Sequence, residues 1–129
     1  MSVTRPGSII LGVSGAVLIV DDNPRFRSRA RRCLENAGYD VVAEAADGAQ
    51  ALEAARRHRP AAVLLDIRLP DRSGLEVAER LGGESRPPAI VLTSTYDAAD
   101  FGDRVARSGA RGFLPKAELS YARFAALVS

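Results

Sequence analysis

Residues 16–22 read Ala-Val-Leu-Ile-Val-Asp-Asp, a run of five apolar residues that ends in two carboxylates. A continuous apolar run of this length, rich in β-branched side chains, is typical of a strand buried on both faces in a parallel sheet covered by helices. The pattern returns at residues 61–66, Ala-Ala-Val-Leu-Leu-Asp. Two such strands, each followed by Asp, indicate an α/β fold with polar groups at the strand ends.

Helical and strand patterns alternate along the chain. A helix is expected over 24–37, where apolar residues form one stripe and Gly38 follows. Another is expected over 97–109, capped by Asp97 and burying Phe101 and Val105. The remaining strands are expected at 39–45, 89–92 and 112–114, and the remaining helices at 47–59, 74–81 and 120–128. This alternation predicts a doubly wound, five-stranded parallel sheet with five helices and right-handed crossovers.

Length and composition fit one globular domain. The chain has 129 residues, of which 47% are hydrophobic and 26% charged. The single cysteine, Cys33, excludes an internal disulfide, and no apolar run approaches the roughly 18 residues that cross a bilayer, so a cytoplasmic protein is expected. Residues 1–15, interrupted by glycines, are interpreted as a flexible lead-in to a domain over 16–129.

The charge balance is mild, because the net charge is only +2. It gives no indication of direct binding to nucleic acid. Arginines nevertheless cluster within 25–32 and 56–59. A solvated helix face is the favoured interpretation of these clusters, and a docking surface for an acidic partner helix is the alternative.

Polar residues lie just after four of the predicted strands. They are Asp21, Asp22, Asp66, Thr93 and Lys116. Ligands of a doubly wound sheet bind at the carboxyl ends of its strands, so these side chains are expected to converge. Adjacent carboxylates repel one another, and a hard cation such as Mg²⁺ relieves the repulsion. Asp66 could then accept a phosphoryl group as an aspartyl phosphate, with Lys116 and the Thr93 hydroxyl each contacting one phosphoryl oxygen.

Four motifs carry a resemblance to a known family. They are Val-Leu-Ile-Val-Asp-Asp-Asn at 17–23, Leu-Leu-Asp-Ile-Arg-Leu-Pro-Asp-Arg-Ser-Gly at 64–74, Ile-Val-Leu-Thr-Ser at 90–94 and Gly-Phe-Leu-Pro-Lys at 112–116. In this order and at these spacings the chain resembles the receiver domains of two-component response regulators. The resemblance implies a flavodoxin-like sheet with strand order 2-1-3-4-5.

The resemblance also implies a role for each matching residue. Asp66 would be the phospho-acceptor, and Mg²⁺ would be held by Asp21, Asp22, Asp66 and the backbone carbonyl of Arg68. Thr93 and Lys116 would hold the phosphoryl group. Thr93 and the aromatic residue Phe113 would form the switch, in which Thr93 moves toward the phosphoryl group and the ring of Phe113 turns inward.

Partners follow from the same resemblance. A sensor histidine kinase or a phosphotransfer protein would supply the phosphoryl group, and the chain would catalyse only its own phosphorylation and dephosphorylation. The face built from 97–109, 112–114 and 120–128 could form a homodimer. Nucleic acid would be bound only through an output domain outside this chain. The stretch 114–119 resembles receivers joined to helix-turn-helix outputs, and a stand-alone receiver is the alternative.

Some residues depart from the family pattern or allow another interpretation. Ala117 follows Lys116 where the family usually has Pro, which leaves the local loop geometry open. A phosphohydrolase would carry a second Asp at position 68, where this chain has Arg, and a receiver that no longer takes phosphate would not be expected to keep the full polar set. Cys33, His58 and Asp71 are interpreted as a core residue, a surface residue and a turn residue.

Overall fold

The computed structural model describes residues 15–129, so the lead-in expected at 1–15 lies, apart from Gly15, outside the described residues. Five parallel strands form one sheet in the order β2-β1-β3-β4-β5, which confirms the predicted fold class and strand order. The strands are Ala16–Val20 (β1), Asp40–Ala45 (β2), Ala62–Asp66 (β3), Ala89–Ser94 (β4) and Gly112–Pro115 (β5).

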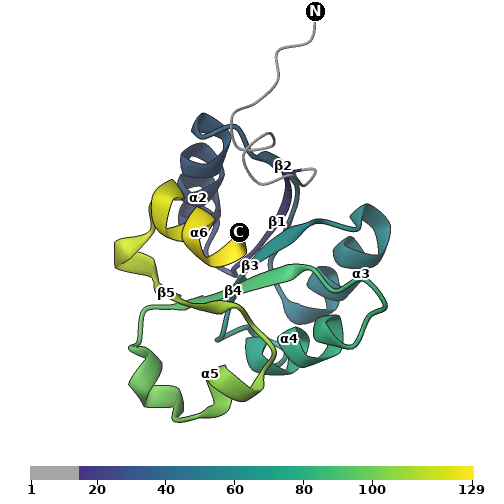
Figure 1. Ribbon diagram of the computed structural model, residues 1–129, viewed down its shortest axis with the longest axis vertical. Coiled ribbons are helices and arrows are strands. Elements are labelled where there is room, and N and C mark those ends of the chain that lie inside the picture. The colour runs from purple at the N-terminus through teal and green to yellow at the C-terminus, as the bar shows by residue number, and fades with distance from the viewer. Residues whose placement is uncertain (1–14) are drawn as a thin grey trace, which may run out of the picture.

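Helices cover both faces of the sheet. Figure 1 shows α2 and α6 on one face and α3, α4 and α5 on the other. The helices are Pro24–Asn36 (α2), Gly48–His58 (α3), Gly74–Gly82 (α4), Arg104–Arg107 (α5) and Tyr121–Val128 (α6), with short 3-10 helices at Ala98–Phe101 (η1) and Lys116–Glu118 (η2). None of the described helices is both long enough and apolar enough to span a bilayer.

The apolar runs are buried on both sides, as a covered parallel sheet requires. Val17 and Ile19 of β1 pack into the layer with α2 and α6, whereas Leu18 and Val20 pack into the layer with α3 and α4. All four side chains are 0% exposed. Because successive side chains of a strand alternate between faces, a strand must be apolar throughout to serve two cores.

The prediction of one continuous helix over 97–109 is wrong. The structure has the four-residue helix η1, then Gly102, then the four-residue helix α5. Gly102 has φ 60 and ψ −138, a backbone conformation outside the helical region that glycine adopts without a Cβ clash. Phe101 and Val105 are consequently half-buried rather than buried. The other predicted element boundaries agree to within about two residues.

The turn into α4 is unusually tight. The N–H of Gly74 donates to the carbonyl oxygen of Ile67 at 2.6 Å. A Cβ placed on Gly74 would lie 2.0 Å from the carbonyl oxygen of Asp66. Only glycine therefore allows the first turn of α4 to approach the end of β3 this closely. At the other end of α4, a Cβ on Gly82 would meet no atom within 4 Å.

We expect Gly74→Ala to lower the free energy of unfolding by at least about 2 kcal/mol, because the backbone of β3 must move to admit the methyl group. Gly82→Ala is the matched control in the same helix, and it should be neutral or stabilising by up to about 1 kcal/mol. Urea unfolding of the two variants measures the difference. Equal unfolding free energies for the two variants would contradict the close approach at Gly74.

Candidate functional site

The carboxyl edge of the sheet gathers side chains from four strands. Asp21 follows β1, Asp66 ends β3, Thr93 lies opposite Asp66 in the register of β4, and Lys116 follows β5. Asp21, Asp66 and Thr93 are buried, with exposures of 0%, 3% and 1%. The topology thus brings together polar groups as far apart along the chain as Asp21 and Lys116, which are separated by 95 positions.

Three carboxylates form an acidic cluster at this edge. One carboxylate oxygen from each of Asp21, Asp22 and Asp66 lies within 4.8 Å of the others. Asp22 is exposed, whereas the other two are buried. Oxygen-only ligands of this kind suit a hard divalent cation such as Mg²⁺, so the donor set fits the ion that the sequence predicted.

Local hydrogen bonds hold the turn that carries two of these carboxylates. The Oδ1 of Asp21 accepts from the N–H of Asn23 at 2.8 Å. Asn23 caps α2, because its Oδ1 accepts from the N–H of Arg25 at 2.9 Å, and Pro24 occupies the first helical position. Only Asp21 and Asp22 separate the end of β1 at Val20 from the cap Asn23 and the proline Pro24, so the sequence determines where β1 stops and α2 begins.

Lys116 is the cation that faces the acidic cluster. Its Nζ lies 2.6 Å from Oδ2 of Asp21 and 3.2 Å from Oδ2 of Asp66. The same Nζ lies 4.8 Å from the ring centroid of Phe26. Burial opposes the charged ammonium, but the contacts with Asp21 and Asp66 outweigh it and raise the pKa of Lys116. The lysine therefore stays charged beside the two buried carboxylates.

Asp66 is a buried carboxylate whose pKa lies above that of an exposed side chain. Burial, and then the negative charge of Asp21, raise the pKa of Asp66 to about 6. Lys116 and the N–H of Arg68, which donates to Oδ1 of Asp66 at 3.1 Å, act in the opposite direction without cancelling the rise. Full ionisation of the carboxylates in the cluster is therefore unfavourable unless a further cation is bound.

The remaining predicted residues lie close to this edge. The carbonyl oxygen of Thr93 accepts from the N–H of Ile67 at 3.0 Å. The guanidinium of Arg68 lies over the ring of Tyr96, 4.3 Å from its centroid. Phe113 is half-buried, and its ring centroid lies 6.3 Å from that of Phe101. These contacts place Thr93, Arg68 and Phe113 in the fold, and the roles predicted for them stay predictions.

Two arginines of α2 have contacts that sequence reasoning missed. Arg27 donates from Nη1 to the carbonyl oxygen of Asp21 at 2.6 Å, and Arg29 donates from Nη2 to the carbonyl oxygen of Lys116 at 2.6 Å. They hold the backbone just after β1 and β5, two of the four strands that contribute to the site. A solvated helix face is therefore an incomplete description of this arginine cluster. No local sequence pattern predicts the hydrogen bond from Arg29 to the carbonyl oxygen of Lys116, because the two residues are 87 positions apart.

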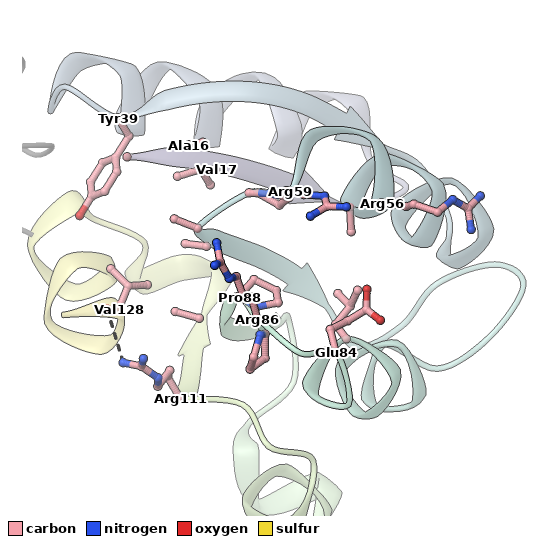
Figure 2. Close-up of a pocket in the computed structure, with 18 of the residues that line it drawn as sticks. Ala16, Val17, Tyr39, Arg56, Arg59, Glu84, Arg86, Pro88, Arg111 and Val128 are labelled. Carbon is pink, nitrogen blue, oxygen red and sulfur yellow. Dashed lines mark hydrogen bonds between the residues drawn. The ribbon is translucent and has the colours of Figure 1, made fainter. Parts of the chain in front are cut away.

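A hollow of about 830 Å³ lies elsewhere, at the amino end of the sheet. Figure 2 shows its lining, which includes Tyr39, Arg59, Arg86 and Pro88. It contains none of the residues predicted for the phosphoryl site. The residues predicted for the phosphoryl site thus lie at the carboxyl edge of the sheet, opposite this hollow.

The family model of the response regulator receiver domain matches residues 17–126. The chain belongs to this family. Receiver domains are the signalling switches of two-component systems. The match includes every residue of the acidic edge described above, from Asp21 to Lys116.

Curated relatives place the domain within longer proteins. The transcriptional regulatory protein PdtaR of Mycobacterium tuberculosis is 34% identical over 100 residues, covering 78% of this chain and 48% of the relative. A protein-glutamate methylesterase/protein-glutamine glutaminase of Hahella chejuensis is 39% identical over 84 residues, covering 65% of this chain and 24% of the relative. The chain spans about half the length, or less, of these relatives.

Solved structures share the fold over most of the chain. The signal receiver domain of NarL from Mycobacterium tuberculosis has a TM-score of 0.78 and 34% identity, covering 87% of this chain and 94% of that one. The chemotaxis response regulator CheY4 of Vibrio cholerae has a TM-score of 0.73 and 27% identity, covering 88% and 91%.

The raised pKa of Asp66 predicts a pH-dependent stability in the absence of divalent cations. Unfolding returns the carboxyl to its ordinary pKa of 3.8, so between about pH 4 and about pH 6 only the folded state keeps the proton, and stability falls as the pH rises. Asp66→Asn removes this titration. In EDTA, the unfolding free energy of Asp66→Asn relative to wild type should increase by about 1–3 kcal/mol from pH 4 to pH 7. A pH-independent difference in urea titrations would contradict this assignment.

Proposed function

We propose that this receiver domain accepts a phosphoryl group on Asp66 in a Mg²⁺-dependent reaction and thereby switches conformation. The observation that carries the proposal is the buried Asp66 carboxylate, which lies 3.2 Å from Lys116 Nζ within a three-carboxylate cluster. A static ion pair would need one acid per base, whereas here Lys116 contacts two buried acids, Asp21 and Asp66, and a third acid, Asp22, lies beside them. That excess of carboxylate favours a cation site next to a nucleophile.

The acidic cluster supplies the ligands for the cation. Asp21, Asp22, Asp66 and the backbone carbonyl of Arg68 would hold Mg²⁺. When bound, Mg²⁺ neutralises the carboxylates and stabilises negative charge on the transferring phosphoryl group. The pKa of Asp66, raised to about 6 by burial and by Asp21, should then fall, which favours the ionised form that attacks phosphorus.

Phosphoryl transfer to Asp66 is a simple displacement. A carboxylate oxygen of Asp66 forms a new bond to phosphorus, and the bond from phosphorus to the donor breaks, so that the leaving group departs with the electron pair. With a sensor histidine kinase or phosphotransfer protein that bond is P–N, and with acetyl phosphate it is P–O. Lys116 would move its contact from Asp66 to a phosphoryl oxygen, and the Thr93 hydroxyl would donate to another.

The switch would begin at Thr93 and pass to Phe113. Thr93 lies opposite Asp66 in the sheet register, and Phe113 contacts the half-buried Phe101 of η1. A phosphoryl group that binds one of two conformations more tightly shifts the population toward that conformation. The face of α5, β5 and α6 would then change and serve an output partner or a homodimer. Nucleic acid would be contacted through an output domain outside this chain, which agrees with the naming of PdtaR as a transcriptional regulatory protein.

The acceptor assignment is tested by intact mass after incubation with Mg²⁺ and acetyl phosphate. We expect wild type to gain one phosphoryl group and Asp66→Asn to gain none. Asp103→Asn is the control, because Asp103 is an exposed carboxylate paired with Arg107 on α5, and it should be phosphorylated like wild type. EDTA should abolish uptake. Full phosphorylation of Asp66→Asn would refute the assignment.

The switch assignment is tested with Thr93→Ala. We expect this variant to accept the phosphoryl group, because Asp66 and Lys116 remain, but to lose the response at Phe113, because no hydroxyl is drawn toward the phosphoryl oxygens. Aromatic NMR signals of Phe113 should shift on phosphorylation in wild type and stay within a small fraction of that shift in Thr93→Ala. An undiminished shift in the variant would rule out Thr93 as the link.

A further inference from the structure

The loop between β3 and α4, residues 67–73, carries Arg68 and is closed at its base. Arg68 and Ser73 pair across it as an isolated antiparallel bridge. The N–H of Gly74 donates to the carbonyl of Ile67 at 2.6 Å, and the N–H of Ile67 donates to the carbonyl of Thr93 at 3.0 Å. Ile67 and Gly74 are therefore fixed to the sheet, and the position of residues 68–73 between them, the Arg68 carbonyl included, also depends on what anchors the tip of the loop.

Asp71 anchors the tip to a different helix. Its Oδ1 accepts from the N–H of Gly48 at 2.8 Å, and its Oδ2 accepts from the N–H of Ala49 at 3.0 Å. These are the first two amides of α3. Arg72 lies against the same turn, because a Cβ on Gly48 would come within 2.5 Å of Arg72 Cγ. We call these contacts of Asp71 and Arg72 with Gly48 and Ala49 the Asp71 clamp.

The clamp is more than a helix cap. Helix α3 already has its own N-cap, since Oδ1 of Asp47 accepts from the N–H of Gln50 at 2.8 Å. Asp71 comes from a loop more than 20 positions away in the chain, and it leaves none of its carboxylate oxygens without a donor. The hydrogen bonds from Gly48 and Ala49 lower the pKa of Asp71, so these two contacts favour its ionised form. What the clamp adds, beyond the cap, is a fixed position for the loop.

We propose that Asp71 is a positioning residue for the divalent-cation site, acting by holding the loop that presents the backbone carbonyl of Arg68. The inference rests on the proposed function, which makes that carbonyl a cation ligand. A loop that is ordered in advance spares the site an ordering cost when the cation binds. Residues that orient ligands in this way commonly change metal affinity about 10- to 100-fold. Because coupling is reciprocal, bound cation should also protect the Gly48 and Ala49 amides from exchange.

The test compares Mg²⁺ affinity of the whole chain by isothermal titration calorimetry in wild type, Asp71→Ala, Asp71→Asn and Asp47→Ala. Asp71→Ala should bind Mg²⁺ about 10-fold more weakly. Asp71→Asn keeps one acceptor oxygen and should lie between the two. Asp47→Ala removes a cap from the same helix without touching the loop, so its affinity should stay within about twofold of wild type.

Thermal unfolding separates positioning from stability. Both alanine variants lose capping bonds on α3, so a similar fall in unfolding midpoint is expected, and only the Mg²⁺ affinity should distinguish them. Hydrogen exchange of Gly48 and Ala49 should slow with Mg²⁺ in wild type. Equal Mg²⁺ affinities for Asp71→Ala and Asp47→Ala, with Mg²⁺ still bound by wild type, would overturn the inference alone. Absence of Mg²⁺ binding by wild type would overturn the proposed function as well.

Discussion

The repulsion among three carboxylates at one edge of the sheet is the constraint on which the rest depends. Asp21 and Asp66 are buried, Asp22 lies beside them, and Lys116 is the cation that contacts the two buried acids. Burial weakens solvent screening, so this excess of negative charge destabilises the folded chain when no cation is bound. A chain selected for stability alone would not be expected to keep such a cluster, whereas a chain selected to bind a cation and a phosphoryl group needs it.

The sheet explains why the cluster can exist at all. In a parallel sheet every strand ends at the same edge, so residues far apart in sequence meet there without any local motif. The two cores on either side of β1 and β3 supply the apolar burial that offsets the unfavourable charges. Around the edge, Arg27 and Arg29 of α2 bind the backbone carbonyls of Asp21 and Lys116, which ties both strand ends to the same helix.

The sequence predicts those parts of the molecule that depend on short-range patterns. The strands β1 and β3 can be predicted from their apolar runs, because a strand buried on both faces requires apolar residues throughout. Prediction fails at 97–109, where Gly102 breaks the helix although the apolar spacing suggests a continuous one. It also misses Arg29 and Asp71, whose partners are 87 and 23 positions away. Such pairings depend on which loops the fold brings together, and nothing in the local sequence encodes that.

The loops at the carboxyl edge of the sheet differ in how firmly they are held, and this difference suits a conformational switch. The loops after β1 and β3 are held by charged side chains, Arg27 and Asp71, that bind backbone groups of neighbouring elements. The segment after β4 has only short helices, and its Phe101 and Val105 are half-buried. Segments with few buried contacts rearrange at the lowest free-energy cost. The rigid side therefore fits the task of holding the proposed reacting groups, and the loosely packed side, where Phe101 meets Phe113, fits the proposed task of responding to them.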